Sequence, residues 1–227
     1  MQQEQSILDS WHVNAAPWSK AIADKAIESR QLVTNAAILQ AITSLQPASV
    51  LDLGCGEGWL SRALKAQLPH ANIKGVDAIP ALIDAAKGLA TGIDYAVASY
   101  QDIIAGALQE EQFDVVAINF ALFGDALVRD LVQTLHKHMH TGGHLVIQTL
   151  HPVVACGDLP YQSGWREGSW AGFSSDFKDA HPWYFRTLED WLALFTDCGY
   201  TIQSMQEPLH PKTGKPASVI FILNNKY

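Results

Sequence analysis

The sequence predicts an α/β fold, a three-layer αβα sandwich in which a mostly parallel, seven-stranded sheet ends in a C-terminal antiparallel hairpin. Three observations support this prediction. Short apolar runs alternate with stretches whose apolar residues recur at helical spacing. The apolar runs are continuous, as in strands buried on both faces, and their alternation with helices implies right-handed βαβ units. Two last apolar runs flank a turn rich in Pro, Gly and Lys, which is typical of a hairpin.

A helical segment, residues 1–46, is expected before the sheet. Apolar residues recur at helical spacing from Ile7 to Leu45, and Pro17 is expected to break this segment into separate helices. The pattern changes after Pro47, where the first continuous apolar run starts. This change marks the beginning of the predicted core.

The predicted core, residues 48–150, alternates five strands with helices. The strands are expected at 49–53, 72–76, 94–98, 113–118 and 144–150. The helices between them are expected at 59–68, 80–89 and 126–138. Five parallel strands in this order form the larger part of the predicted sheet.

An insertion, residues 151–187, interrupts the alternation of strands and helices. It is rich in Gly, Pro and aromatic residues, and at 37 residues it is long enough for an irregular segment to favour a functional role. The last part of the chain, residues 188–227, resumes the pattern. A helix is expected at 188–198, followed by strands near 200–206 and 217–223. The whole chain is therefore expected to form a single domain.

Composition and charge narrow the function classes. The chain has 227 residues, 48% of them hydrophobic, and a formal net charge of −8, so it can bury a core and is expected to repel nucleic acids and anionic membranes. Neither a signal peptide nor a membrane-spanning run is apparent, which predicts a cytoplasmic protein. Three distant cysteines without a C-x-x-C pair are expected to be reduced thiols. We expect a monomer or a homodimer.

A glycine-rich segment follows the first predicted strand. Residues 52–58 read Asp-Leu-Gly-Cys-Gly-Glu-Gly, and glycines at this place permit a tight turn and a close approach of the backbone to a ligand. A simple strand-to-helix turn is the alternative reading. The dinucleotide-binding pattern G-x-G-x-x-G needs a third glycine at position 59, which is Trp59 here, and no phosphate-binding G-x-x-x-x-G-K-[ST] occurs.

This segment resembles, residue for residue, the first motif of the class I S-adenosylmethionine-dependent methyltransferases. The resemblance extends over about residues 48–150: Asp77 ends the second strand, Asn119 follows the fourth, and Gly142-Gly143 resembles the turn that leads into the fifth. The chain looks most similar to the small-molecule branch, which includes quinone-biosynthesis O-methyltransferases. The resemblance implies a Rossmann-like fold and S-adenosylmethionine as the cofactor.

The resemblance also implies which residues bind the cofactor. Asp77 is expected to accept hydrogen bonds from the two ribose hydroxyls, a task that suits the two oxygens of a carboxylate. An arginine in the N-terminal helices, Arg30, is expected to pair with the cofactor's carboxylate. Many relatives have an aspartate at the adenine; here Ser99 and Tyr100 occupy that place, and Asp102 is expected to be a helix cap. The other expected cofactor-binding residues are Asp52, Gly54, Cys55, Gly56, Ala78 and Asn119.

Few catalytic residues are expected, because methyl transfer from a sulfonium is an in-line displacement with a neutral leaving group. A general base is needed only where the acceptor must lose a proton. The candidates are His151, at the end of the fifth strand, and His181 and Tyr184, near the end of the insertion. A structural, hydrogen-bonded histidine is the alternative for either position. The aromatic insertion is expected to pack the acceptor.

No metal site is expected. Four histidines lie close together in the sequence, but no H-E-x-x-H motif or nearby carboxylate completes a set of metal ligands, and basic residues are favoured at the end of a helix. These histidines are His136, His138, His140 and His144.

The sequence thus predicts transfer of a methyl group to a small molecule, with O-methylation favoured. N-methylation on the same fold and a non-catalytic module that binds S-adenosylmethionine or S-adenosylhomocysteine remain alternatives. A macromolecular acceptor is disfavoured by the acidic charge and by residues 119–122, which read Asn-Phe-Ala-Leu where amino-methylating enzymes have [DN]-P-P-[YFW]. Replacing His151 or His181 distinguishes an enzyme from a binding module, because only an enzyme loses turnover while it still binds the cofactor.

Overall fold

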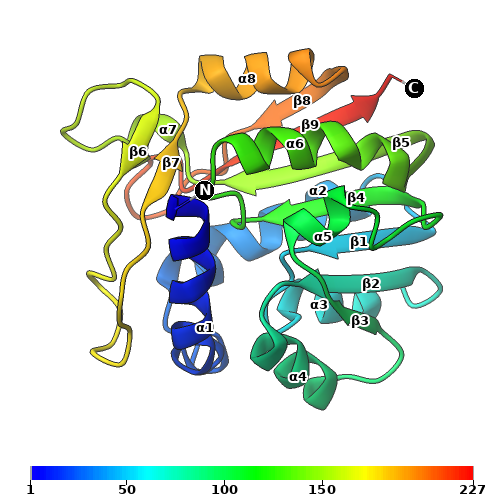
Figure 1. Ribbon diagram of the computed structural model, residues 1–227, viewed down its shortest axis with the longest axis horizontal. Helices are drawn as coiled ribbons and strands as arrows, with labels where there is room; N and C mark the ends of the chain where they lie inside the picture. The colour runs from blue at the N-terminus through cyan, green and yellow to red at the C-terminus, as the bar shows by residue number, and fades with distance from the viewer. Residues whose placement is uncertain (1, 227) are drawn as a thin grey trace.

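Seven strands form one sheet in the order β3-β2-β1-β4-β5-β9-β8 in the computed structural model, which describes residues 2–226 (Figure 1). The strands of this sheet are β1 (Ser49–Leu53), β2 (Asn72–Asp77), β3 (Asp94–Val97), β4 (Phe113–Asn119), β5 (Met139–Thr149), β8 (Tyr200–Gln206) and β9 (Val219–Asn225). Strand β9 runs antiparallel to both of its neighbours, whereas β1 to β5 are parallel. The predicted fold class is confirmed.

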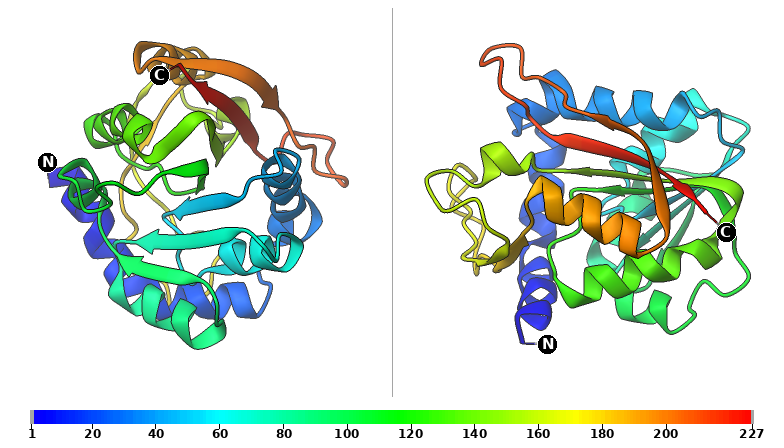
Figure 2. Two further views of the ribbon diagram at one scale, coloured as in Figure 1. Left: turned by 90° about the vertical axis from the view of Figure 1, so that its right-hand side faces the viewer. Right: turned by 90° about the horizontal axis from the view of Figure 1, so that it is seen from above.

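Helices cover both faces of the sheet (Figure 2). The helical elements are α1 (Gln2–Ala23), the π-helical turn η1 (Arg30–Thr34), α2 (Asn35–Thr43), α3 (Trp59–Gln67), α4 (Pro80–Leu89), α5 (Tyr100–Ile104), α6 (Ala126–Thr134), the 3-10 turn η2 (Leu135–His138), α7 (Pro152–Ala155) and α8 (Leu188–Asp197). Side chains of α2 and α3 pack on one face, and those of α5, α6 and α8 pack on the other. Strands β1 and β4 lie between them and are almost fully buried, which explains their continuous apolar sequences.

Local sequence signals define several helix starts. Ser99 caps α5 in a capping box with Asp102, as expected for Asp102, and Thr187 caps α8 by accepting a hydrogen bond from the Asp190 amide. Pro80 occupies the first turn of α4, where the proline's missing N–H costs nothing. These caps place the starts of both helices next to the ends of strands.

Helix α1 corrects the prediction that Pro17 breaks the N-terminal segment. The helix runs through Pro17 to Ala23 and ends only where Lys25 adopts a left-handed backbone with φ of 55°. Proline removes one N–H, so the carbonyl of Val13 loses its helical partner. Val13 is exposed, so water can satisfy this carbonyl and the helix continues.

Strand β5 and the insertion are also more regular than predicted. The strand starts at Met139 instead of 144, and Gly142 and Gly143 lie inside it, where a shift in register against β4 accommodates them. The insertion contains α7 and a small antiparallel sheet of β6 (Gly164–Arg166) and β7 (Trp183–Phe185). Helix α1 and the insertion both lie at the edge where the carboxyl ends of β1, β4 and β5 meet (Figure 1).

Candidate active site

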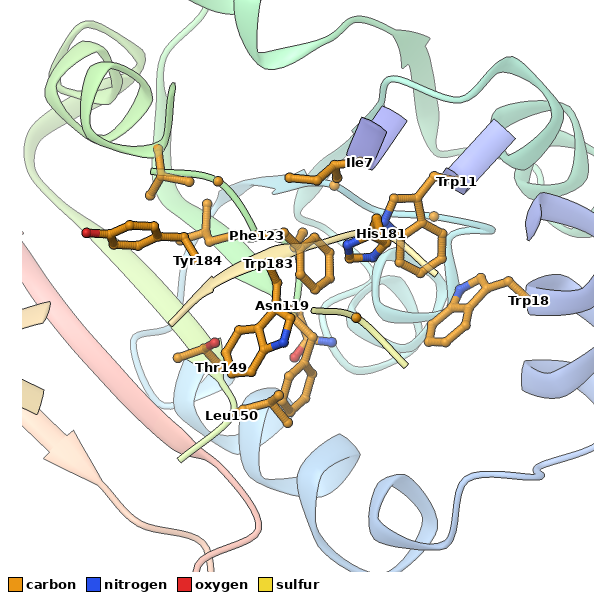
Figure 3. A pocket seen from close by; sticks show the side chains of 18 of the residues that line it. Ile7, Trp11, Trp18, Asn119, Phe123, Thr149, Leu150, His181, Trp183 and Tyr184 are labelled. Carbon is orange, nitrogen blue, oxygen red and sulfur yellow. The ribbon is translucent and has the colours of Figure 1, made fainter. Parts of the chain in front are cut away.

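A cavity of about 440 Å³ lies at the carboxyl ends of the parallel strands, the edge where open α/β sheets bind their ligands. Three parts of the chain enclose it: the loops after β1, β2 and β4 form its floor, α1 covers one side, and the insertion covers another. We call the part next to the glycine-rich loop the cofactor half, and the part lined by the insertion the acceptor half. Figure 3 shows side chains of this lining.

The glycine-rich loop after β1 has no room for side chains at two of its glycines. A Cβ on Gly54 would lie 2.5 Å from the Cβ of Ala121, and one on Gly58 would lie 2.5 Å from the Tyr95 hydroxyl. Both glycines also have positive φ, 74° and 80°. The loop therefore packs its backbone directly against neighbouring segments, and Gly54, Cys55 and Gly56 line the cavity.

Asp77 ties the ends of β1 and β2 together at the cavity. Its Oδ2 accepts a hydrogen bond from the Gly56 amide at 2.8 Å, and its Oδ1 accepts one from the Ile79 amide at 2.9 Å. Burial raises the pKa of Asp77, and these amide donors oppose the rise. Each oxygen keeps a lone pair for a further donor, so the residue can hold a diol while it fixes the loop. Ala78, beside it, also lines the cavity.

Asp52 lies beneath the loop and outside the lining. It is buried, and its Oδ2 accepts a hydrogen bond from the Ser61 hydroxyl at 2.6 Å, which connects β1 to α3. Burial raises the pKa of Asp52 to about 7, against the hydrogen bond from Ser61. The structure thus places this predicted cofactor residue as a support of the loop.

Two buried groups of opposite charge line the cofactor half. Arg30 lies against the faces of Trp59 and Trp18, 4.6 and 5.6 Å from the ring centroids, and its Nη2 has no hydrogen-bond partner among the described residues. Burial lowers the pKa of Arg30 to about 10, so it stays protonated at neutral pH. The Oε2 of Glu57 is likewise buried and unpartnered in the described part of the chain, while Arg62 contacts its other oxygen.

The adenine candidates occupy different environments. Ser99 does not line the cavity, because its hydroxyl belongs to the cap of α5. Tyr100 lines it, and its hydroxyl donates a 2.9 Å hydrogen bond to the Ala121 carbonyl, beside Gly54. Gln101, which the sequence reading did not single out, also lines the cavity. The capping-box pattern of Ser99 and Asp102 was the signal that could have removed Ser99 from the candidates.

Asn119 and Phe120 form the turn between the two halves. Asn119 lines the cavity and its Oδ1 is buried without a partner in residues 2–226. Phe120 has φ of 53°, a left-handed backbone that is strained for an aromatic residue, and its amide donates to the Gln148 carbonyl. In Figure 3 Asn119 lies beside Trp183 and Thr149.

The structure brings His181 and Tyr184 to the cavity but leaves His151 outside the lining. His151 is buried, and its Nε2 lies 2.7 Å from the Glu207 carboxylate at the end of β8. Tyr184 lines the cavity, but its hydroxyl points away from His181 in Figure 3. Burial raises the pKa of Tyr184, so its phenol stays protonated at neutral pH.

His181 sits in an aromatic cluster on the acceptor side. Its ring centroid lies 4.8 Å from that of Phe123 and 5.8 Å from those of Trp11 and Trp170. The Nδ1 lies 2.9 Å from the Pro182 carbonyl; because a carbonyl only accepts, Nδ1 carries the proton and Nε2 is the acceptor of the neutral ring. Burial lowers the pKa of His181 from its ordinary 6.5, which keeps the ring neutral at pH 7.

Helix α1 contributes cavity residues that sequence reasoning missed. Trp11 and Trp18 both line the cavity, and Trp18 faces Gly56 across 3.6 Å, measured from its Nε1 to a Cβ built on that glycine. Their spacing of seven residues puts both rings on one face of the helix, a pattern that also fits ordinary core packing. Only the assembled fold shows that this face covers the cavity.

His136, one of the four histidines near residue 140, packs at the end of the sheet. His136 stacks on Tyr200, with 4.4 Å between ring centroids, and lies within hydrogen-bond distance of the Asn225 side chain and the Cys198 carbonyl. Within residues 2–226 no group of three or more His, Cys, Asp or Glu could hold a metal ion. In the same part of the chain, no helix combines the length and hydrophobicity that a membrane crossing requires.

The sheet order, the glycine-rich loop and the acidic residue after β2 form the arrangement of the class I methyltransferase fold, and solved structures with this fold include S-adenosylmethionine-dependent methyltransferases. Residues 50–143 match the family model described as a methyltransferase domain, and this part of the chain belongs to that family. A ubiquinone biosynthesis O-methyltransferase from Xylella fastidiosa is 34% identical over 116 residues, or 49% of this chain and 46% of the relative. The chain thus spans about half the length of the curated relatives it matches first.

Solved structures confirm the fold over the whole chain. The plantazolicin methyltransferase BamL, solved with a triazolic desmethylPZN analogue and S-adenosylhomocysteine (SAH), has a TM-score of 0.69 at 14% identity and covers 100% of this chain and 97% of its own. The N-methyltransferase NodS from Bradyrhizobium japonicum, solved with SAH, has a TM-score of 0.58 at 16% identity and covers 85% of each chain. At these identities the likeness establishes the fold.

Proposed function

We propose that this protein transfers a methyl group from S-adenosylmethionine to a small, largely apolar acceptor, and that the acceptor atom is an oxygen. One observation supports this most: a single cavity joins a glycine-rich loop with buried charges at one end to an aromatic wall at the other. The first end suits a charged nucleotide-like cofactor, and the second suits a flat apolar molecule. The match to ubiquinone biosynthesis O-methyltransferases favours oxygen over nitrogen.

The cofactor half fits the amino-acid and ribose groups of S-adenosylmethionine. The buried Nη2 of Arg30 and the buried Oε2 of Glu57 offer a donor for a carboxylate and an acceptor for an ammonium group. Asp77 offers carboxylate oxygens to the ribose diol, and the backbone of Gly54 to Gly56 permits a close approach. When bound, the cofactor supplies an electrophilic methyl group on a positively charged sulfur.

The acceptor half orients its substrate and excludes water. Trp11, Phe123 and Trp183 provide flat apolar surfaces in the lining of the cavity. Such walls align an aromatic acceptor for in-line attack, and this alignment is the main catalytic requirement of the reaction. The Nε2 of neutral His181 accepts the proton that a hydroxyl group loses when it attacks.

The charged side chains of the acceptor half are already occupied, which favours an uncharged acceptor. Arg186 donates to the carbonyls of Gly124 and Asp125 and to the Asp125 carboxylate. Glu4 accepts a hydrogen bond from the Asp125 amide. A substrate that carried a phosphate or carboxylate would lose its water without gaining a counter-charge here, at a cost of several kcal/mol. We therefore infer that neutral phenols are better acceptors than their carboxylated counterparts.

The first test is calorimetric titration of the purified protein with S-adenosylmethionine, SAH and NAD, each in a separate experiment. Binding of the first two and not of NAD supports the proposal, whereas binding of NAD alone contradicts it. A screen of paired phenols and anilines with radiolabelled methyl groups then identifies the acceptor atom. Transfer to the phenol supports O-methylation, and transfer to the aniline alone contradicts it.

A His181→Gln variant separates an enzyme from a binding module. Glutamine keeps a polar side chain at this position but cannot take up a proton at neutral pH. We expect unchanged SAH affinity together with a loss of methyl transfer. Tight SAH binding by the wild-type protein without transfer to any acceptor of either series contradicts the proposed O-methylation and favours a non-catalytic binding module.

A further inference from the structure

Asn14 joins α1 to the insertion through a buried two-way hydrogen bond. Its side chain is fully buried; its Nδ2 donates to the Lys178 carbonyl at 2.7 Å, and its Oδ1 accepts from the Lys178 amide at 2.9 Å. The side-chain amide thus pairs with both the backbone carbonyl and the backbone amide of Lys178, as a neighbouring β-strand would. The Nδ2 also donates to the Ser10 carbonyl, one turn earlier in the helix, at 2.8 Å, which fixes the side-chain rotamer.

Lys178 is connected to the wall around His181. Trp170 donates from Nε1 to the same Lys178 carbonyl at 2.9 Å, and its ring packs 5.8 Å from that of His181. Gly168 lies so close to His181 that a Cβ on it would be 1.8 Å from the His181 carbonyl oxygen. The two sides of the insertion, residues 168–170 and 178–181, are therefore packed as one unit.

We propose that Asn14 is a positioning residue for His181, so that the acceptor half of the cavity forms only when α1 is docked. This inference rests on the proposed role of His181 as the proton acceptor. Asn14 fixes the position of Lys178, and the packed segments 168–170 and 178–181 connect Lys178 to His181. Trp11, on the same helix as Asn14, contacts the His181 ring. A misplacement of about 1 Å can reduce the rate on the order of 100-fold.

The same helix also reaches the cofactor half. Trp18, four residues after Asn14, lies against Arg30 and faces Gly56. Helix α1 thus contacts both halves of the cavity through side chains of one face.

The NMR titration of the His181 imidazole provides a test that does not depend on activity. The rings that face His181 from α1, from the loop after β4 and from the insertion are Trp11, Phe123 and Trp170, and all three are uncharged. Desolvation by burial therefore governs the pKa of His181, with the Pro182 carbonyl opposing it. Its resonance is assigned by its disappearance in the His181→Gln variant.

Asn14→Ala is the decisive variant, and Gln5→Ala is its matched control, because Gln5 is an exposed amide on the same helix whose side chain donates a hydrogen bond to Asp9. We expect Asn14→Ala to move the pKa of His181 up towards 6.5 as water enters, with SAH affinity within about threefold of the wild type, less than 0.7 kcal/mol. The Gln5→Ala variant keeps the wild-type titration. An unchanged His181 titration in folded Asn14→Ala overturns the proposal.

Trp170→Phe keeps the test decisive if Asn14→Ala does not fold. Phenylalanine retains most of the ring packing and removes only the Nε1 donor to Lys178. We expect a smaller shift of the His181 titration in the same direction, and no shift contradicts the proposal. Should the wild type methylate nothing while the titration still depends on Asn14, the proposed function fails and the positioning role remains. If the wild type transfers methyl groups but the His181 titration does not depend on Asn14, the proposed function stands and the positioning role fails.

Discussion

The two halves of the cavity are built in different ways. The cofactor half is built around one stretch of chain, from the glycine-rich loop at 54–58 to Asp77, to which Trp18 and Arg30 add side chains. Its parts are held by hydrogen bonds of the backbone, such as that from the Gly54 amide to the Val76 carbonyl. The acceptor half combines rings from α1, the loop after β4 and the insertion, which are far apart in sequence. The insertion is held to α1 by the side chain of Asn14.

This difference separates what the fold requires from what the substrate requires. Backbone contacts in the cofactor half depend on glycine and on strand ends, so few sequences satisfy them. Side-chain packing in the acceptor half tolerates many combinations of aromatic residues, provided that volume is maintained. Substitutions in the first half are therefore expected to remove cofactor binding, whereas substitutions in the second are expected to spare it.

The largest effect is expected from Gly54→Ala. The new Cβ would meet the Ala121 Cβ at 2.5 Å and the residue would keep a positive φ, so overlap and backbone strain together cost about 3 to 5 kcal/mol. Calorimetry should find no SAH binding. Gly88→Ala is the matched control, because a Cβ there has no atom within 4 Å and the site lies in α4; it should bind SAH normally.

Next in size is the loss of turnover in His181→Gln. Removing a general base typically reduces the rate about 10²- to 10⁴-fold. If His181 is the proton acceptor, its neutral ring is the active form. Because burial holds the pKa of His181 below 6.5, kcat/KM of the wild type should rise with pH through a midpoint below 6.5 and level off near neutrality. A wild-type profile that is flat between pH 5 and 8 would contradict this role.

A somewhat smaller effect is expected from Asp77→Ala. In the proposed binding mode, the variant loses two charge-assisted hydrogen bonds to the ribose, which together contribute on the order of 2 to 4 kcal/mol. It also releases the Gly56 and Ile79 amides, which loosens the loop. SAH affinity measured by calorimetry should fall accordingly. Unchanged affinity would show that the ribose binds elsewhere.

The smallest effect on binding is expected from Asp52→Asn, because this side chain lies under the loop. SAH affinity should stay within about threefold of the wild type. The pKa of Asp52 is about 7 in the folded protein and 3.8 ordinarily, so the folded state holds the extra proton between these values. Wild-type stability should therefore fall as pH rises from 4 to 7, and urea unfolding should show a weaker fall in the variant. An equal slope in both proteins would rule out this titration.

The fold could be predicted in detail because its signals are local. Helix α4 matches its predicted range and β2 is one residue longer than predicted, since buried strands and capped helices leave clear patterns. Pro17 was misjudged because a helix can continue through a proline where water replaces the lost hydrogen bond, and the exposure of Val13 is a tertiary property. The strand at Gly142 was placed too late because glycines inside a bulge resemble a turn.

The site was predictable only in the cofactor half. Gly54, Gly56 and Asp77 form a motif of contiguous segments, so their position followed from strand ends. His151 and His181 could not be ranked, because both lie in the predicted insertion, residues 151–187, and both precede a proline. Only the packed structure shows that Glu207 holds the first and that the second lines the cavity. Asn14 has no sequence signal at all, since its partner is a backbone 164 residues away.

The place of β9 in the sheet determines the order in which the sheet can be completed. This strand follows β8 in the chain but lies between β5 and β8 in space, so β8 has no partner in the sheet until residues 219–225 are in place. Until then the edge of β5 presents unpaired amides and carbonyls beside an apolar face, and such an edge recruits strands from other chains. Incompletely folded protein is therefore most prone to aggregate through β5. A synthetic peptide with the sequence of β9, added during refolding, should pair with β5 and suppress this aggregation.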